Sequence, residues 1–291
     1  MIRTTALTKR YGAGVAVDGV DLQVDEGSIY GLVGPNGAGK TTLLGLVSGL
    51  RRPTSGSLHV EARLEEIAVL PDTPKFDPWL TGREVVVLAQ SLSQSKADRV
   101  DEVIHDAGIE HAAGRAVGGY SRGMLQRLGV ACTVVGSPRL LLLDEPASAL
   151  DPLGRREVLD LVARLRGVAT VLFSSHILSD VQQVCDTVGV MDKGKMLFQG
   201  PLEGLLVGSA LPRYVVRCRP PIEPVVAALA AEDWVQLVEQ TSPDEASVTV
   251  RSLTDAESRL AGALAAAGAR VISLGPEAVS LERAFLELTG Q

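Results

Sequence analysis

Residues Gly34-Pro-Asn-Gly-Ala-Gly-Lys-Thr-Thr42 match the pattern Gly-x4-Gly-Lys-[Ser/Thr]. A compact apolar run over 28–33 predicts a strand directly before them, and the pattern from Lys40 to about Leu50 predicts a helix directly after them. The glycines allow tight turns that point several backbone N–H groups at an anion, and the helix N-terminus adds roughly half a positive charge. Because an ordinary Gly-rich turn lacks this context, the stretch predicts a phosphate-binding loop.

The side chains at the end of the loop suit a nucleoside triphosphate. The Lys40 ammonium group would neutralise the β- and γ-phosphates, and the Thr41 hydroxyl would be a ligand for Mg²⁺. A bound magnesium ion usually also has a carboxylate ligand. The loop therefore predicts an acidic partner further along the chain.

Two adjacent acids, Asp144 and Glu145, provide that partner. They follow the apolar run 140–143, which predicts a buried strand, and parallel sheets bind ligands at the carboxyl ends of their strands. Asp144 is suited to hold Mg²⁺ through water. Glu145 is suited to polarise an attacking water as a general base, a role worth roughly 10²–10⁴-fold in rate. The simpler interpretation, two solvated acids at a strand end, is weakened by the upstream loop.

Strands and helices alternate in the region after the acids. Strands are predicted at 140–143, 169–173 and 187–191, and helices at 153–165 and 177–184 lie between them. This alternation is typical of a parallel sheet covered by helices.

The segments before the acids have other patterns. Alternating apolar positions before residue 24 predict short strands, as do the stretches 57–60 and 67–70. The middle section is predicted to be helical, and Thr81 and Glu84 form a capping-box pattern there.

A stretch rich in Pro, Gly and Ser at 201–212 predicts a domain boundary. The tail beyond it reads strand, helix, strand, strand, helix, strand, which is the order of a ferredoxin-like unit, and a final helix is predicted at 281–288. About 80 residues suffice for a small core. The sequence thus predicts a domain over 1–208 and a small α+β accessory domain over 209–291.

Three further strings occur in the first domain: Ser121-Arg-Gly-Met-Leu-Gln-Arg127, Ser148-Ala-Leu-Asp151 and Ser174-Ser-His176. With the loop and the acids, they resemble the motifs of the ATP-binding-cassette (ABC) ATPases. The first string resembles the signature motif, usually Leu-Ser-Gly-Gly-Gln, the second the loop that crosses the dimer interface, and the third the switch histidine that contacts the γ-phosphate. The resemblance covers about residues 1–208, and with Tyr11, which resembles the family's adenine-stacking aromatic residue, six ordered motifs make it specific.

The resemblance implies an α/β fold of the P-loop NTPase, ABC ATPase type. Its parts are a parallel core sheet, an antiparallel N-terminal β subdomain and a helical subdomain at about 73–137, followed here by the ferredoxin-like domain. It also implies an ATPase with ATP and Mg²⁺ as ligands, with Glu145 and His176 as the catalytic residues. The nucleotide- and metal-binding residues carried over are Tyr11, Gly34, Pro35, Asn36, Gly37, Ala38, Gly39, Lys40, Thr41, Thr42, Asp72, Ser121, Gly123, Asp144 and Asp151, with Thr41, Asp72 and Asp144 toward the metal.

Some positions are less specific or depart from the family pattern. Tyr11 resembles the aromatic residue that stacks on adenine, but a tyrosine at a strand end is also ordinary. Ser121 would also be a good N-cap for the helix that follows it. Arg122 and Met124 differ from the signature consensus. Asp72 stands where the family has a glutamine, so whether it touches the metal directly stays open.

The composition narrows the functional classes. The chain has 291 residues, a net charge of −7 and 3% aromatic residues, which argues against a protein that binds nucleic acid. Three scattered cysteines favour neither a disulfide framework nor a zinc site. The N-terminus lacks a signal-peptide pattern, and no apolar run approaches the ~20 residues that span a bilayer. We therefore expect a protein peripheral to the cytoplasmic face of the cell membrane.

The tail string Ser280–Gly290 resembles the end of many ABC exporter subunits. It implies export of a drug or antibiotic, a lipid or an ion through a separately encoded integral-membrane permease, by a homodimer or a heterodimer with a related ATPase. The alternatives are a soluble ABC ATPase that acts on ribosomes or DNA, and a small-molecule P-loop kinase. A regulatory or purely binding role for the tail is a further hypothesis.

Overall fold

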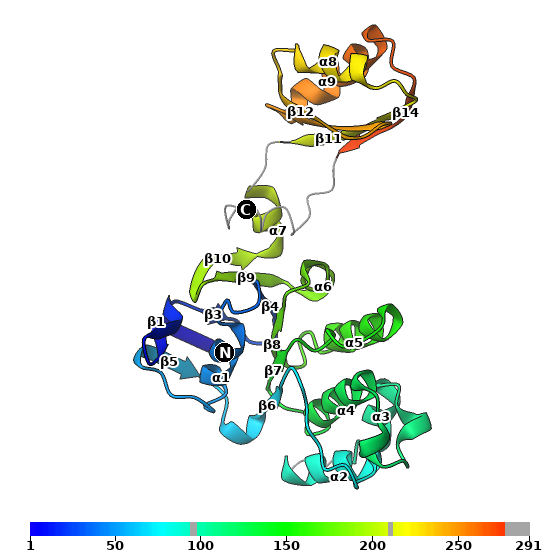
Figure 1. Ribbon diagram of the computed structural model, residues 1–291. Coiled ribbons are helices and arrows are strands. Elements are labelled where there is room, and N and C mark those ends of the chain that lie inside the picture. Colours follow the sequence, from blue (N-terminus) through cyan, green and yellow to red (C-terminus); the bar gives the residue numbers. More distant parts are fainter. Residues whose placement is uncertain (94–97, 209–211, 277–291) are drawn as a thin grey trace. The chain divides into compact units, whose positions relative to one another are not determined.

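The computed structural model describes residues 1–93, 98–208 and 212–276, which form two compact units (Figure 1). Among these residues, the first unit ends at Gly204 and the second begins at Leu205. Each unit has its own cluster of buried apolar side chains. The two units therefore have independent hydrophobic cores.

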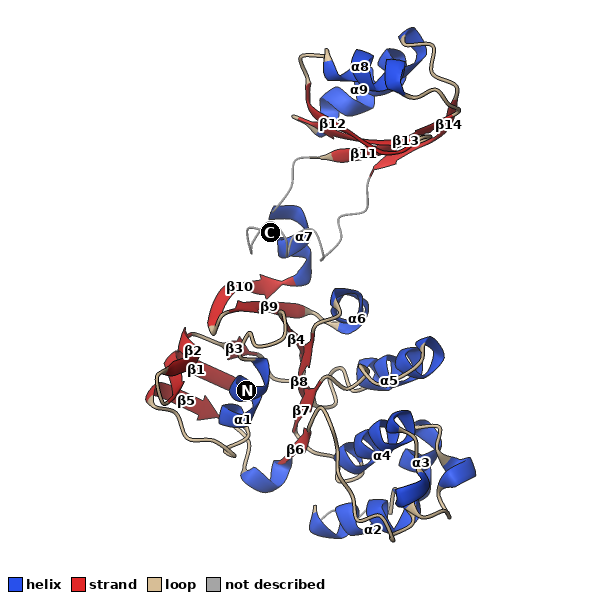
Figure 2. Cartoon of the chain, in the orientation of Figure 1, coloured by secondary structure: helices blue, strands red, loops and turns tan. Residues whose placement is uncertain are grey.

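A six-stranded sheet forms the centre of the first unit (Figure 2). Its strands, in spatial order, are β10 (Lys195–Pro201), β9 (Thr187–Asp192), β4 (Ile29–Val33), β8 (Thr170–Ser175), β7 (Leu140–Asp144) and β6 (Ile67–Leu70). All neighbours are parallel except β10, which runs antiparallel to β9. The three central strands are buried along their whole length, as parallel strands covered on both faces should be.

The prediction of a parallel sheet is confirmed, and β10 was not predicted. Its residues alternate between exposed and half-buried positions, and they end at Pro201, where the sequence was interpreted as the start of a boundary. A helix follows directly, α7 (Leu202–Gly208), within the stretch that the Pro and Gly content had marked as a linker. Much of the stretch that composition predicted to be an irregular linker is therefore helix α7, which directly follows β10.

Helices cover both faces of this sheet (Figure 2). On one face lies α1 (Lys40–Val47), and on the other lie α5 (Pro152–Arg164) and α6 (Leu178–Val184). Asp151 caps α5 by accepting a hydrogen bond from the Gly154 N–H, and Pro152 occupies the first turn, where its missing N–H costs nothing.

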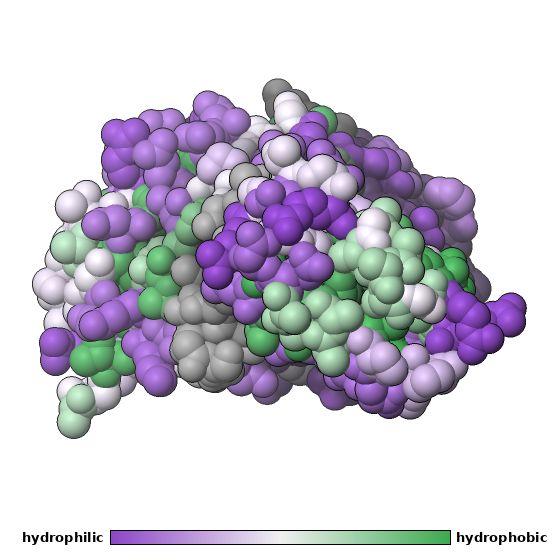
Figure 3. Space-filling view, turned by 90° about the horizontal axis from the view of Figure 1, so that it is seen from above, coloured by the Kyte–Doolittle hydropathy of each residue, from purple (hydrophilic) through white to green (hydrophobic). Residues whose placement is uncertain are grey.

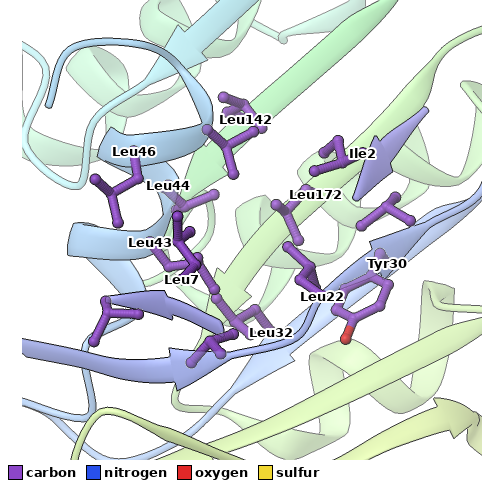
Figure 4. Close-up of a cluster of buried hydrophobic side chains, with 14 of the residues drawn as sticks. Ile2, Leu7, Leu22, Tyr30, Leu32, Leu43, Leu44, Leu46, Leu142 and Leu172 are labelled. Carbon is purple, nitrogen blue, oxygen red and sulfur yellow. The ribbon is translucent and has the colours of Figure 1, made fainter. Parts of the chain in front are cut away.

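A smaller antiparallel sheet packs with α1 on the same side. It consists of β1 (Ile2–Tyr11) paired with β2 (Gly14–Val20), β3 (Gln23–Val24) and β5 (Ser55–Val60). Figure 4 shows Leu7 and Leu22 from this region against Leu43 of α1 and Leu172 of the central sheet. Burial of one such side chain is worth about 1.5–3 kcal/mol, so this cluster holds α1 against the two sheets.

The middle section is helical, as predicted. It contains α2 (Gly82–Leu92), α3 (Val100–Asp106) and α4 (Arg122–Val134), with short 3-10 turns at η2 (Glu110–Ala112) and η3 (Val117–Gly119); a further 3-10 turn, η1 (Leu64–Glu66), precedes β6. The capping box at the start of α2 is present: Thr81 and Glu84 exchange side-chain and backbone hydrogen bonds. The three α-helices pack against one another and carry the Ser121 segment.

The second unit has the predicted ferredoxin-like order. Its elements are β11 (Arg213–Cys218), α8 (Glu223–Ala230), β12 (Val235–Ser242), β13 (Glu245–Val250), α9 (Leu253–Ala266) and β14 (Val271–Pro276). The strands form one antiparallel sheet in the order β12-β13-β11-β14. The predicted helix at 281–288 and the string Ser280–Gly290 lie outside the described residues.

Among the residues that the structure describes, no helix has the length and apolar character needed to cross a bilayer. In the space-filling view of Figure 3, hydrophobic patches occur among hydrophilic residues on the face shown.

Candidate nucleotide-binding site

The loop between β4 and α1 contains glycines at positions where a side chain would be strained or would clash. Gly39 has a φ of +105°, and a Cβ atom there would lie 2.3 Å from the Ala16 carbonyl oxygen. A Cβ at Gly34 would lie 2.2 Å from the Met191 carbonyl oxygen. Gly37 also has a positive φ, +84°. The backbone is therefore held tightly against its neighbours, with the N-terminus of α1 facing the loop.

Lys40, the first residue of α1, is almost completely buried. Its Nζ donates hydrogen bonds to the carbonyl oxygens of Gly34, at 2.7 Å, and Pro35, at 3.3 Å. The same Nζ lies 3.6 Å from Glu145 Oε1. The ammonium group is thus folded back over the loop and paired with Glu145, which lies in the turn after β7.

The two acids at the end of β7 point in different directions. Asp144 is buried and accepts a 2.5 Å hydrogen bond from the Ser174 hydroxyl on β8. Glu145 has a φ of +51°, a left-handed conformation that costs a non-glycine residue roughly 1–2 kcal/mol. Its N–H is held by the backbone oxygen and the hydroxyl of Ser174, at 3.2 and 3.1 Å. This turn takes the chain sharply off β7 and brings the Glu145 carboxylate to Lys40.

His176 follows β8 and completes a chain of three charged or titratable groups. Its Nδ1 lies 2.8 Å from Glu145 Oε2, whereas Lys40 approaches Oε1 of the same carboxylate. The imidazole is 43% exposed and the Glu145 side chain only 12%. The nearly buried Glu145 carboxylate therefore lies between the Lys40 ammonium group and the His176 imidazole, next to the phosphate-binding loop.

These groups line one cleft of about 370 Å³. The predicted residues that it brings together are Asn36, Gly37, Ala38, Gly39, Lys40, Thr41, Thr42, Asp72, Glu145 and His176. Gly34 and Pro35 belong to the loop, and Asp144 lies behind it on β7.

Four residues of the site region were not predicted. Ala16 and Ser148 line the cleft, and the Ser148 hydroxyl lies 3.5 Å from Asp72 Oδ1. Ser174 holds both acids, and the buried Gln126 donates a 3.4 Å hydrogen bond to the Glu145 carbonyl oxygen. Three of these lie inside or beside strings that the sequence singles out, but Ala16 is brought to the loop by the tertiary fold alone.

Four other predicted residues lie outside the cleft of their own chain. The Ser121 hydroxyl accepts a hydrogen bond from the Met124 N–H at 3.2 Å, so it is the N-cap of α4, and Gly123 lies in the first turn. Asp151 caps α5, as described above. Tyr11 is 46% exposed, and its ring lies beside the cations of Lys9 and Arg51, the latter also donating to the Tyr11 hydroxyl.

The residues present fit a magnesium nucleotide. Backbone N–H groups, the helix N-terminus and Lys40 surround a space for phosphates, and Thr41, Asp72 and Asp144 offer the oxygen ligands that Mg²⁺ prefers. In the described part of the chain, no group of three or more His, Cys, Asp or Glu forms a metal site. Mg²⁺ bound with a nucleotide does not require such a group, because phosphates and water supply most of its ligands.

A Gly-rich loop between a buried strand and a helix, with acids at the end of a parallel strand of the same sheet, defines a P-loop nucleoside triphosphatase. Comparison with known proteins then gives the family. The family model described as "ABC transporter" matches residues 17–148. The chain is 39% identical over 218 residues to the bacitracin transport ATP-binding protein BcrA of Bacillus licheniformis, covering 70% of this chain and 71% of that protein.

A second relative matches almost the whole chain. The daunorubicin resistance ATP-binding protein DrrA2 of Streptomyces coeruleorubidus is 35% identical over 307 residues, which covers 99% of this chain and 95% of that protein. Among solved structures, the dimeric post-hydrolysis ATP-binding cassette MJ0796, bound to ADP and Pi, has a TM-score of 0.64 at 23% identity over 69% of this chain and 99% of that one.

The chain belongs to the ABC transporter family. It is an ATP-binding subunit with the ABC ATPase fold, and it hydrolyses ATP. The prediction of the family and fold is confirmed, and the comparisons do not favour a soluble ABC ATPase of ribosomes or DNA.

Proposed function

We propose that this chain powers the export of a drug or antibiotic, a lipid or an ion through a separately encoded membrane permease at the cytoplasmic face of the cell membrane. The observation that carries this proposal is the similarity to a daunorubicin resistance ATP-binding protein over 99% of the chain, because it extends through both units. The name of the relative that is described as a bacitracin transport ATP-binding protein supports the same proposal.

For hydrolysis, we propose that Glu145 is the general base and that His176 orients it. Glu145 Oε2 is engaged by His176, and Oε1 faces Lys40, so phosphates that draw Lys40 toward them would free one oxygen to accept a proton from water. Thr41, Asp72 and Asp144 would hold Mg²⁺, which neutralises negative charge on the phosphate oxygens. Asp144 is fixed for this task by Ser174.

We also propose that two copies, or this chain and a related ATPase, close over the nucleotide. Ser121, Gly123 and Asp151 do not line the cleft of their own chain, although the resemblance places them at the nucleotide or at the dimer interface. Contribution from a second subunit reconciles these facts, and the solved cassette MJ0796 is itself described as dimeric. The second subunit then touches the nucleotide only in the closed state, which is the differential affinity that a conformational switch requires.

Residues 209–291 are proposed to be an accessory domain with a structural or regulatory role. The buried cluster formed by β11–β13 with α8 and α9 gives it a core of its own. Deletion of 209–291 separates the two roles: loss of both dimerisation and ATP hydrolysis indicates a structural role, and an altered ATPase rate in an intact dimer indicates a regulatory one.

The transport proposal is tested by affinity purification of the full chain from a detergent extract of its own cells. Co-purification of a polytopic membrane protein that stimulates ATP hydrolysis supports it. Recovery with ribosomes, and in no membrane fraction, would replace it with the soluble alternative.

A further inference from the structure

A buried ion pair joins the helix that begins at Asp151 to the helix that follows His176. Arg155 lies on α5, one turn beyond its cap, and Asp180 lies in the first turn of α6. Arg155 Nε is 2.5 Å from Asp180 Oδ1, and the two side chains are 27% and 6% exposed. The pair therefore connects two helices that each follow a predicted site residue, Asp151 before α5 and His176 before α6, although neither Arg155 nor Asp180 lines the nucleotide cleft.

The helix α6 depends on such a connection. It has seven residues, and its N-cap residue, Ile177, makes no capping hydrogen bond with its side chain. Isolated helices of this length are not stable in water, so contacts with the rest of the fold determine where α6 lies. Val181 and Val184 are buried, but they lie in the part of α6 that is further from His176. At the end of α6 nearest His176, the Ser175 hydroxyl holds the backbone of Ile177, and Asp180 makes the side-chain contact with another helix.

The Arg155–Asp180 ion pair borders a groove between the two helices. This groove, of about 620 Å³, is lined by residues of both helices that include Pro152, Leu159 and Gln183. Burial raises the pKa of Asp180, while the hydrogen bond and charge of Arg155 and the nearby His176 imidazole act to lower it. Because desolvation offsets much of the attraction in a buried pair, such a pair is weak evidence for stability. Its clearer consequence is a fixed geometry between α5 and α6.

We propose that Arg155 and Asp180 are positioning residues for ATP hydrolysis, which hold the start of α6 so that His176 stays on Glu145. This inference rests on the proposed roles of Glu145 and His176. It predicts that loss of the pair slows hydrolysis through His176 and leaves the binding of ATP intact.

Two variants test the pair in the full-length chain. Asp180→Asn keeps the shape of the side chain and removes its charge, and Arg155→Lys keeps the charge and removes the planar guanidinium geometry. Each should lower kcat roughly tenfold or more and change KM for ATP less than about twofold, since misplacement of a catalytic group acts on the reacting complex. Arg156→Ala, an exposed position next to Arg155, is the matched control and should leave both constants unchanged.

A double-mutant cycle with His176→Ala distinguishes positioning from general weakening of the fold. If Asp180 acts through His176, Asp180→Asn has little further effect on kcat once His176 is alanine. Additive losses would overturn the inference while leaving the role of His176 standing. If His176→Ala alone hydrolyses ATP at the wild-type rate, the proposed role of His176 and the inference both fall.

The histidine ring signals give a readout that does not depend on activity. The chain has four histidines, and His59, His105 and His111 serve as internal references. In Asp180→Asn, the ring resonances of His176 should move and those of the other three should not. An unmoved His176 signal in the folded variant would overturn the inference. If Asp180→Asn does not fold, Arg155→Lys provides the same measurements.

Discussion

Lys40 and Glu145 form an ion pair within one chain, with Nζ 3.6 Å from Oε1 and both side chains nearly buried. The lysine comes from the first turn of α1 and the glutamate from the turn after β7, so the phosphate-binding group and the proposed base constrain each other. A buried charge is stable only while it is paired, and replacement of either residue therefore affects the other. Because the two residues are paired, their separate roles can be distinguished only by experiments that measure ATP binding and ATP hydrolysis independently.

Glu145→Gln should bind ATP and hydrolyse it at least about 100-fold more slowly, because the amide cannot accept a proton from water. The variant should accumulate as an ATP-bound dimer in gel filtration, while phosphate release reports the rate. Glu157→Gln, at an exposed position on α5, is the control. Hydrolysis by Glu145→Gln at the wild-type rate would show that Glu145 is not the base.

Lys40→Ala should weaken ATP binding at least about tenfold, since the loop loses its cation and Glu145 is left buried without one. Isothermal titration calorimetry measures the change. Lys195→Ala removes a lysine that is 65% exposed and should bind ATP normally. An unchanged Kd in Lys40→Ala would dismiss the assignment of the phosphate loop.

Ser121→Arg should spare ATP binding by the monomer and abolish the ATP-dependent dimer, because the bulky cation occupies the surface proposed to meet the second nucleotide. The substitution also removes the N-cap of α4, a loss of about 1 kcal/mol. Ser252→Arg removes the corresponding cap of α9 and is the control for that loss. A normal dimer in gel filtration of Ser121→Arg with ATP would count against the composite site.

Gly39→Ala should lower the free energy of unfolding by roughly 1–3 kcal/mol, because its φ of +105° and the 2.3 Å approach to the Ala16 oxygen leave no room for a methyl group. Gly262→Ala, in the interior of α9 with no atom within 4 Å of the added methyl, should raise it by about 0.5–1 kcal/mol. Urea unfolding measures both. Equal effects at the two positions would contradict the described geometry of the loop.

Removal of Mg²⁺ by a chelator should abolish hydrolysis, and addition of excess Mg²⁺ should restore it. Asp144→Asn should raise the Mg²⁺ concentration needed for half-maximal rate more than Asp72→Asn does, because Asp144 is buried and fixed by Ser174 whereas Asp72 is exposed. The Mg²⁺ dependence of both variants at saturating ATP measures this order. The reverse order would make Asp72 the main carboxylate toward the metal.

The elements that the sequence predicted best are those with strong local signals. The loop 34–42, the capping box at Thr81 and the apolar run before Asp144 lie within short stretches, and their structures follow from backbone sterics and hydrogen bonding over a few residues. β10 was missed because its partner β9 supplies its ladder of hydrogen bonds, and Gly and Pro near its end were interpreted as a linker.

The sequence by itself determined the fold class, the phosphate loop and the identities of the acids and the histidine, because these follow from local residue patterns and their spacing. Only the tertiary structure decided which of them meet. The register of β7 and β8 pairs Asp144 with Ser174, and the turn after β7 brings Glu145 to Lys40 and His176. The tertiary fold also brings Ala16 to the loop and leaves Ser121 and Asp151 outside the cleft as helix caps. The physical reason is that contacts between distant segments depend on sheet register and on burial of the whole core, which no short stretch of sequence specifies.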